Sequence, residues 1–414
     1  MMIRGTDVTN IKINYRRAVE GKFPDKLNFR LQKESDLRYG ENPNQPAAMY
    51  HIDERSRLEI IKDFSYKYFG RFFGLPNPHK LSISELTNIR LVKSAKEGLS
   101  ATNFMDITGA LEILKFFEVP AAAVMKHLVP SGFARQFQGS SLDRIYEQAR
   151  DADARSAFGS VVVFNRPVDK ITAEAIMSSY VEGVAAPEFE EGTVEILERK
   201  KDIRIILYSN LDIIPKFEGD DINRLYDFKT HPIGRVLVQK PYLSRIKGKN
   251  DLVKDPLVKK NGVQFVVERN PTEEELDDLL SAWYVNLGVR SNGIVFFKNG
   301  TTIAVGTGQQ ERVGSVEQAI IKSYQKAMDR EGISYDAING ATQRNLLSYN
   351  PLEGSVISSD GFFPFRDSID TLAKHGVSAI IQPGGSVRDC EIIQAVNENN
   401  MAMTYTLERC FGHF

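Results

Sequence analysis

Apolar residues recur along this chain with two alternating periods, one typical of helices and one typical of buried strands. Residues 106–117 carry apolar side chains at helical spacing, with Asn103 and Asp106 as candidate caps, and residues 120–125 follow as a short apolar strand. Residues 160–164 form a β-branched strand, and residues 172–180 form a helix. This alternation predicts a layered α/β fold.

The second half of the chain continues the alternation. Thr272 and Glu275 form a capping box that opens a helix through Tyr284. Asn299-Gly300 accepts the positive φ values of a type I′ turn, so the apolar runs on either side are predicted to form a hairpin. The pattern then predicts a helix that Ser315 caps and that ends near Arg330, a strand at 378–381, a helix at 387–398 capped by Ser386, and a strand at 402–406.

The length and one polar segment indicate two domains. Residues 217–221 are polar and turn-rich, and a chain of 414 residues is long enough for two or three cores. We therefore predict an N-terminal domain over residues 1–220 and a C-terminal domain over residues 221–414.

Charge and composition exclude several classes of protein. The 53 basic and 54 acidic residues leave a net charge of -1, which excludes a strongly basic clamp for nucleic acid. No run approaches the roughly 18 uncharged apolar residues of a membrane span, and the first residues do not form a secretory signal. The two cysteines, Cys390 and Cys410, form no CxxC pair and fit a reducing compartment. We expect a cytoplasmic protein that contacts neither membrane nor nucleic acid.

Lys126 and His127 follow directly after the apolar strand at 120–125, and α/β folds tend to bind ligands at such strand ends. Neighbouring side chains on an extended strand point to opposite faces, so both can face one site only if the chain turns there. Pro130 and Gly132 are the candidates for that turn. The alternative is a surface lysine beside a half-buried histidine, and the residues alone leave both interpretations open.

Aromatic residues and carboxylates are interleaved at residues 360–367. They fit a stacking wall for a flat heteroaromatic ligand, or else a buried aromatic turn in which Arg366 is ion-paired. The small-residue loop at 306–312 lacks the spacing of a dinucleotide fingerprint and the lysine of a P-loop, although its amides and Arg312 could bind an anion. Arg38, Tyr39 and Arg409 are further candidate phosphate ligands, with solvated surface positions as the alternative.

Metal chemistry has little support in the sequence. The 6 histidines show no HxxxH or HExxH spacing, and no GxSxG motif occurs. The residues alone therefore predict a cytoplasmic α/β protein, an enzyme that binds a small anionic ligand.

Taken together and in order, these segments resemble the AICAR transformylases, which act on aminoimidazole carboxamide ribonucleotide. Residues 37–45 (LRYGENPNQ) are similar to the LRYGENPHQ signature of that family. The further motifs are Lys126-His127-x-x-Pro130-x-Gly132, Ser156-Ala-Phe-Gly159, Arg166-Pro-Val-Asp169, Ser291-Asn292-x-Ile294-Val295, Gly306-x-Gly308-Gln309-x-x-Arg312, Ser359-Asp-x-Phe-Phe-Pro-Phe-Arg-Asp367, Gln382-Pro-Gly-Gly-Ser386 and Arg409-x-Phe411-x-His413. The resemblance runs from about Phe23 to the C-terminus, and it favours a functional role for Lys126 and His127.

The resemblance implies transfer of a formyl group from 10-formyltetrahydrofolate to the 5-amino group of AICAR, which gives FAICAR in purine synthesis. His127 would help to remove the amine proton, and Lys126 would stabilise the oxyanion or assist the departing folate nitrogen. Asn292 would orient the formyl group, and Asp367 would position the folate. The other implied ligands are Arg38, Tyr39 and Arg409 for the phosphate, Asp153 and Arg312 for the ribose or base, and Phe362 and Pro364 for the folate.

The resemblance also implies an architecture and an assembly. The family fold is a pair of cytidine-deaminase-like α/β subdomains that lack the zinc site, here with a helical insertion at about 315–355 in the second. The family forms homodimers with active sites at the subunit interface, and a monovalent cation is a candidate ligand. Only 36 residues precede Leu37, too few for an IMP cyclohydrolase domain, so we expect a stand-alone transformylase and a separate cyclohydrolase.

Two other classes of protein are open as hypotheses. A non-catalytic regulatory protein could bind nucleotide with this fold, although binding alone would not require Lys126, His127, Asn292 and Asp367 together. A zinc nucleoside deaminase would need a Cys/His cluster with a CxxC pair, which the chain lacks. The sequence departs from the family pattern at Asn44, Leu128, Val129 and Ser131, so formyl donor, folate affinity or rate could differ.

Overall fold

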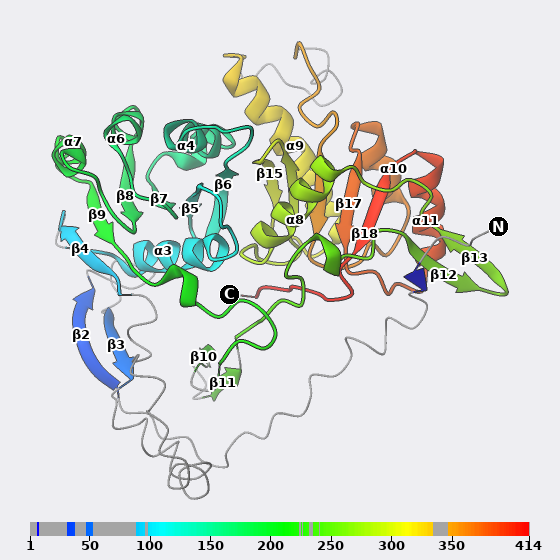
Figure 1. The fold of residues 1–414 in the computed structure, drawn as a ribbon, viewed down its shortest axis with the longest axis horizontal. Helices are drawn as coiled ribbons and strands as arrows, with labels where there is room; N and C mark the ends of the chain where they lie inside the picture. The colour runs from blue at the N-terminus through cyan, green and yellow to red at the C-terminus, as the bar shows by residue number, and fades with distance from the viewer. Residues whose placement is uncertain are drawn as a thin grey trace, which may run out of the picture.

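The computed structural model describes residues 6–7, 31–37, 47–52, 88–95, 98–222, 225, 227–231, 235–239, 241–333 and 347–413. Its centre is a mixed sheet of 11 strands that runs through both halves of the chain (Figure 1). From edge to edge the order is Ala402–Tyr405 (β18), Ala379–Gln382 (β17), Val356–Ser359 (β16), Ile294–Lys298 (β14), Thr301–Gly306 (β15), Val129–Arg135 (β6), Ala121–Lys126 (β5), Ser160–Phe164 (β7), Val181–Ala186 (β8), Arg204–Leu207 (β9) and Arg90–Lys93 (β4). The predicted α/β class is confirmed.

The two halves of this sheet repeat one order of elements. In the first half the helices Ala101–Leu114 (α3), Leu142–Asp151 (α4), Lys170–Met177 (α6) and Thr193–Glu198 (α7) precede β5, β7, β8 and β9. In the second half the corresponding helices are Glu273–Asn286 (α8), Arg312–Arg330 (α9), Asp367–Lys374 (α10) and Asp389–Glu398 (α11), before β14, β16, β17 and β18. Each half begins with an antiparallel hairpin and ends with three parallel strands. The halves meet where β15 pairs with β6.

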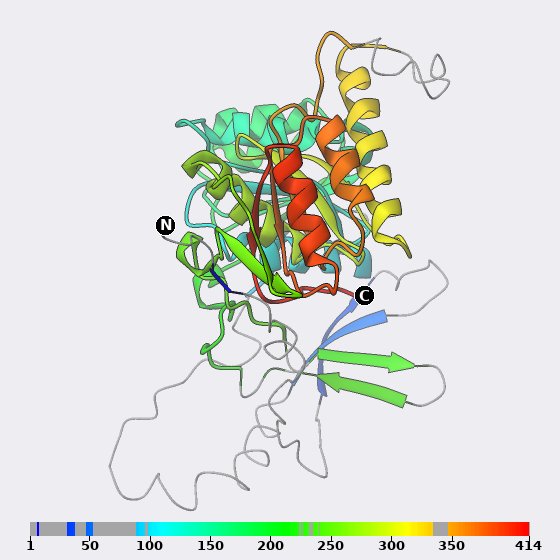
Figure 2. The ribbon, with the colours of Figure 1, turned by 90° about the vertical axis from the view of Figure 1, so that its right-hand side faces the viewer.

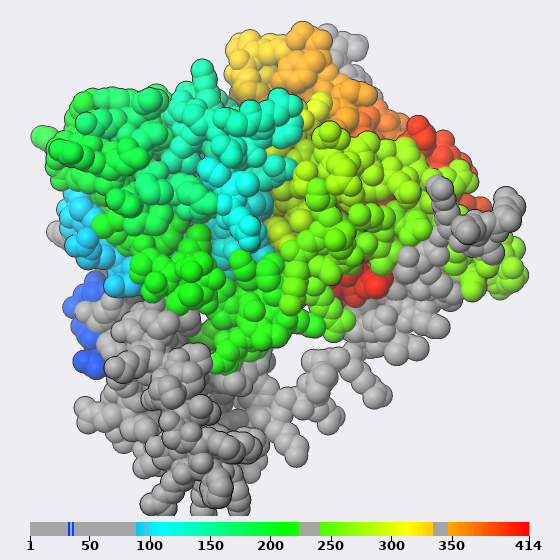
Figure 3. Space-filling model, in the orientation of Figure 1, coloured from blue at the N-terminus to red at the C-terminus, as the bar shows by residue number. Residues whose placement is uncertain are grey.

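Helices cover both faces of the sheet. Alternate residues of β5 face opposite sides, so Ala121, Ala123 and Met125 pack in one core with residues of α3 and α8, while Ala122 and Val124 pack with α4. The helices α3 and α8 therefore share one face, whereas α4, α6 and α7 cover the other face of the first half (Figure 1). The helices α9, α10 and α11 lie side by side over the second half (Figure 2). The surfaces of the two halves adjoin along their junction (Figure 3).

Smaller sheets lie beside the main one. They are formed by Thr6–Asp7 (β1) with Pro256–Lys260 (β12) and Val263–Val266 (β13), by Asp227–His231 (β10) with Arg235–Gln239 (β11), and by Leu31–Leu37 (β2) with Ala47–Ile52 (β3). Short 3-10 helices span Leu211–Ile213 and Lys249–Asp251. Among the helices in the described ranges, none has the length and apolar character needed to cross a membrane.

Predicted elements with strong local signals are confirmed. The strand β7 spans Ser160–Phe164, as predicted. The helix α8 begins after Thr272, whose side chain accepts a hydrogen bond from the Glu275 amide at 3.2 Å. The Asn299-Gly300 turn joins β14 to β15, with φ values of 51° and 78°. The division into domains near residue 220 and the insertion at 315–355 stay predictions.

Several predicted helix caps are wrong. The helix α3 begins at Ala101 because Ser100 and Asn103 form a capping box, so Asn103 and Asp106 lie inside the helix. The helix α9 begins at Arg312, and the Ser315 hydroxyl donates instead to the Asn292 carbonyl at 2.7 Å. The cap of α11 is Arg388, and the Ser386 hydroxyl instead accepts the Arg388 amide at 3.1 Å before the helix begins.

Candidate active site

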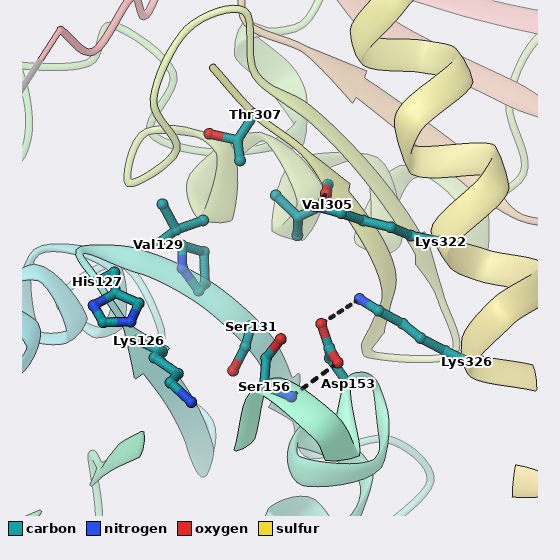
Figure 4. Close-up of a pocket in the computed structure, with 11 residues that line it drawn as sticks. Lys126, His127, Val129, Ser131, Asp153, Ser156, Val305, Thr307, Lys322 and Lys326 are labelled. Carbon is teal, nitrogen blue, oxygen red and sulfur yellow. Dashed lines mark hydrogen bonds and ion pairs between the residues drawn. The ribbon is translucent and has the colours of Figure 1, made fainter. Parts of the chain in front are cut away.

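The hairpin of β5 and β6 carries two candidate catalytic residues. The strand β5 ends at Lys126 and β6 begins at Val129, so His127 and Leu128 form the turn between them. Both turn residues have positive φ, 54° and 65°, a region that residues other than glycine rarely adopt. Because the chain reverses here, Lys126 and His127 line the same pocket (Figure 4).

The predicted position of this turn, at Pro130 and Gly132, is wrong because both residues lie within β6. Gly132 instead allows β6 to approach α4 closely, since a Cβ at this position would lie 1.8 Å from the carbonyl oxygen of Ala149. The turn is bound from α3, where the carboxylate of Asp106 accepts the Leu128 amide at 2.7 Å. A residue of another element therefore contacts the turn through its side chain.

The pocket lies where the two halves of the sheet meet, and its empty volume is about 520 Å³. One wall comes from the β5–β6 hairpin and the short helix Ala154–Ala157 (α5), and the facing wall comes from β15 and α9 (Figure 4). Its polar lining residues are Lys126, His127, Ser131, Asp153, Ser156, Thr307, Lys322 and Lys326, with Val129, Pro130 and Val305 as apolar neighbours.

An ion pair joins the two walls of the pocket. The ammonium of Lys326 lies 2.9 Å from the carboxylate of Asp153, which also accepts the Ser156 amide at 3.1 Å (Figure 4). Burial by itself raises the pKa of Asp153, but the charge and hydrogen bonds of Lys326 and Ser156 outweigh it and lower that pKa overall. Burial lowers the pKa of Lys326 in spite of this partner. The carboxylate of Asp153 is thus engaged within the protein.

The other lysines of the pocket donate to backbone carbonyls. The Lys126 ammonium donates to the Phe158 carbonyl at 2.6 Å, and the Lys322 ammonium donates to the Val305 carbonyl at 3.0 Å. Burial, with the like charge of Lys326, lowers the pKa of Lys322. Lys322 and Lys326 are not among the predicted site residues, although two lysines one helical turn apart on a largely apolar face are a signal for them in the sequence.

A second polar cluster forms around Arg312 at the beginning of α9. Its buried guanidinium donates to the Ser359 hydroxyl at 2.8 Å, to the Asp360 carboxylate at 2.6 Å and to the Asn292 side-chain oxygen at 2.7 Å. The Asn292 amide in turn donates to the Gln309 carbonyl at 2.8 Å. The structure therefore brings Asn292 and Arg312 together, as two of the predicted site residues.

The aromatic segment after Asp360 has features of both predicted structures, the buried aromatic turn and the stacking wall for a ligand. Phe363 is fully buried, and Arg366 pairs with Asp370 at 2.9 Å, as expected for a structural turn. Phe362 and Pro364 are half-buried, Phe365 is 49% exposed, and the exposed Asp367 begins α10, so these side chains can meet a ligand. The Asp367 carboxylate accepts the Ser368 amide at 2.7 Å.

The C-terminal segment brings Arg409 beside the second cluster. The guanidinium carbons of Arg409 and Arg312 lie 4.9 Å and 6.0 Å from the centre of the Phe411 ring. The Cys410 amide donates to the Asp360 carbonyl at 3.2 Å, which fixes the segment there. Arg38, Tyr39 and Asn44 lie outside the described residues.

Asn103 and Glu182 also lie close to the hairpin, and sequence reasoning missed Glu182. The Asn103 side chain donates to the Glu182 carboxylate at 3.1 Å, and the charge of Glu182 acts on the nearby Asp106. Acidic residues at otherwise apolar positions of α3 and β8 were the available signal. Over the described parts of the chain, His, Cys, Asp and Glu side chains form no group of three or more arranged to hold a metal ion.

The chain is similar to known proteins over most of its length. Residues 8–322 match the family described as AICARFT/IMPCHase bienzyme. The bifunctional purine biosynthesis protein PurH of Persephonella marina is 35% identical over 402 residues, which are 97% of this chain and 64% of the relative. The proteins of the same name from Magnetococcus marinus and Pelodictyon phaeoclathratiforme are 36% and 34% identical, over 95% and 94% of this chain and 62% and 60% of those relatives.

The chain thus spans less than two thirds of the length of these relatives. The family match covers more than half of this chain and includes Lys126, His127, Asn292 and Arg312. The chain therefore belongs to the AICARFT/IMPCHase bienzyme family.

Proposed function

We propose that this protein transfers a formyl group from 10-formyltetrahydrofolate to the 5-amino group of AICAR, which gives FAICAR in de novo purine synthesis. The observation that carries the proposal is the turn at His127, which directs Lys126 and His127 into one pocket in a chain of this family. The names of the relatives, bifunctional purine biosynthesis proteins, support the pathway.

The chemistry requires help for a weak nucleophile. The amine of AICAR is conjugated with the imidazole carboxamide, so its attack on the formyl carbon has to be coupled to loss of a proton. In the proposed mechanism the His127 imidazole assists that proton transfer, through the carboxamide. The Lys126 ammonium stabilises the oxyanion of the tetrahedral intermediate and assists the departing folate nitrogen. Asn292 orients the formyl group.

The remaining candidate residues are assigned to binding. Arg409, with Arg38 and Tyr39, is proposed to bind the nucleotide phosphate, which the position of Arg409 beside the Arg312 cluster supports. Asp153 and Arg312 are proposed to bind the ribose or base. Phe362, Pro364 and Asp367 are proposed to bind the folate, and the half-buried rings of Phe362 and Pro364 and the exposed carboxylate of Asp367 support this role.

We further propose that the protein acts as a homodimer with shared active sites. The pocket that Lys126 and His127 line does not include Asn292, Arg312 or Asp367. A second copy could bring these groups to the pocket across a subunit interface. The repeated order of elements also supports the proposal that each half is a cytidine-deaminase-like unit. A bound monovalent cation and a separate cyclohydrolase stay predictions.

An assay of formyl transfer tests the proposed function. Purified protein is mixed with AICAR and 10-formyltetrahydrofolate, and release of tetrahydrofolate is followed together with formation of FAICAR. We expect stoichiometric release that depends on both substrates. Binding of AICAR without any release, at all folate concentrations, would contradict the proposal and would favour a non-catalytic nucleotide-binding protein.

A further inference from the structure

Hairpins at corresponding places in the two halves of the sheet each contact a buried aspartate of the preceding helix. The helices α3 and α8 each have 14 residues and each follow a capping box. The sixth residue of each helix is a buried aspartate, Asp106 in α3 and Asp278 in α8. Asp278 accepts the amides of Asn299 and Gly300 at 2.6 Å and 3.0 Å, and Asp106 accepts the Leu128 amide at 2.7 Å.

The two turns differ in how much external support they need. Asn299 and Gly300 form the dipeptide that adopts a type I′ turn most readily. Leu128 has the same left-handed backbone, with φ 65°, but neither the small side chain of glycine nor the amide of asparagine that makes this region accessible. The turn of His127 and Leu128 therefore depends more strongly on an acceptor outside the hairpin.

Asp106 is well placed to supply that acceptor. Asp106 is 3% exposed, and it is not one of the residues that line the pocket. Burial raises the pKa of Asp106, while the amides of Leu128 and His127 and the charge of His127 act in the opposite direction. The carboxylate thus interacts with the turn and does not contact the pocket.

We propose that Asp106 is a positioning residue for His127: by binding the Leu128 amide, it holds the turn that presents the imidazole at the pocket. The inference rests on the proposed function, in which His127 takes part in proton transfer. Displacement of a reacting group by about 1 Å can lower a rate about 100-fold, so loss of this contact should act on turnover more than on substrate binding.

Variants with and without the acceptor test the proposal. Asp106→Leu removes the acceptor, and Asp106→Asn keeps an oxygen at the same place. Asp278→Leu removes the corresponding acceptor from the second hairpin, together with its ion pair with Arg135 at the far end of β6. We expect Asp106→Leu to lower kcat at least about tenfold with little change in the Kd for AICAR, and Asp106→Asn to stay within about threefold of wild type. Asp278→Leu should lower the Tm without lowering kcat. Hydrogen exchange at the Leu128 amide should accelerate in Asp106→Leu and not in Asp278→Leu.

Wild-type turnover in Asp106→Leu, or an equal loss of kcat in Asp278→Leu, would overturn the proposal. A loss of about 100-fold in the kcat of Asp106→Asn would also overturn the proposal, because the charge of residue 106 rather than its acceptor oxygen would then matter. If Asp106→Leu does not fold, Asp106→Asn decides the question. A wild-type protein that releases no tetrahydrofolate would instead contradict the proposed function. Exchange at the Leu128 amide would still test whether Asp106 holds the turn.

Discussion

At the scale of single residues, the hydrogen bonding of Lys126 bears on its proposed role as the group that stabilises the oxyanion. Its ammonium donates one hydrogen bond, to the Phe158 carbonyl at 2.6 Å, which directs it along the wall of the pocket. An ammonium has three N–H donors, and within the described part of the chain the Phe158 carbonyl takes one of them, so the proposed mechanism assigns another to a developing negative charge. Lys298 holds the corresponding place before the second hairpin turn, where it donates to the Glu353 carbonyl at 2.5 Å and does not line the pocket.

Replacing Lys126 and Lys298 in turn distinguishes an effect on formyl transfer from a general effect on the fold. We expect Lys126→Met to lower kcat by roughly 10²- to 10³-fold, because a donor to the oxyanion is lost while the side-chain volume is kept. Lys298→Met should leave kcat unchanged, which makes it the matched control. Steady-state rates of tetrahydrofolate release provide the measurement. Equal rates for Lys126→Met and wild type would exclude Lys126 from the mechanism.

At the scale of elements, a buried ion pair joins α9 to the residue that caps α5, next to a more exposed pair of Arg155 with Asp329. The side chains of Asp153 and Lys326 are 15% and 10% exposed, and their charged atoms are 2.9 Å apart. A buried pair of this kind stabilises little by itself, but removal of one partner leaves an uncompensated charge in the interior. The pair therefore constrains the two walls of the pocket.

We expect Asp153→Asn to lower the free energy of unfolding by about 3–5 kcal/mol, because the Lys326 ammonium loses its partner. The double variant Asp153→Asn, Lys326→Met should recover most of that loss, as urea titrations would show. The lowered pKa of Asp153 stabilises the fold above its ordinary pKa of 3.8 and ceases to do so as the pH falls through the lowered value. The difference in unfolding free energy between wild type and Asp153→Asn should therefore become smaller at acid pH. Unfolding free energies of wild type and Asp153→Asn that differ by less than about 0.5 kcal/mol at neutral pH would contradict this account.

Close contact between β6 and α4 gives a further prediction. A Cβ at position 132 would lie 1.8 Å from the Ala149 carbonyl oxygen, a backbone atom that cannot move without shifting α4. We expect Gly132→Ala to lower the free energy of unfolding by about 1–3 kcal/mol or more. Gly248→Ala is the control, because Gly248 has extended backbone and no atom within 4 Å of the added Cβ. Equal unfolding free energies for the two variants would show that α4 adapts without cost.

Elements with local signals could be predicted from sequence, and the site could be predicted only in part. The β-branched run of β7 and the Asn299-Gly300 turn are determined by neighbouring residues, and both predictions are confirmed. The turn at His127 lies earlier in the chain than predicted, and its contact with Asp106, in another element, leaves no signal in the neighbouring sequence. Lys126 and His127 could be selected from their place after a strand, but the pairing of Asp153 with Lys326 depends on how the two halves of the sheet meet.

At the scale of the whole molecule, the division of polar groups between two clusters has a consequence for assembly. If active sites form between subunits, a dimer of one His127→Asn subunit and one Asp367→Ala subunit contains one intact site and one doubly altered site. Random mixing gives half mixed dimers, so we expect about a quarter of wild-type activity from two inactive variants. Tetrahydrofolate release after joint refolding or co-expression provides the measurement. If each chain formed its own site, the mixture would stay inactive.

The central claim is that the His127 imidazole takes part in formyl transfer, and His127→Asn tests it most directly. Asparagine tolerates the φ of 54° at this position, so the turn should persist while the imidazole is removed. Tetrahydrofolate release and AICAR binding are measured on the same preparation, with the Tm as a check on folding. We predict a kcat lower by roughly 10²- to 10⁴-fold, with AICAR affinity and Tm close to wild type. A folded variant with near-normal turnover would contradict the account.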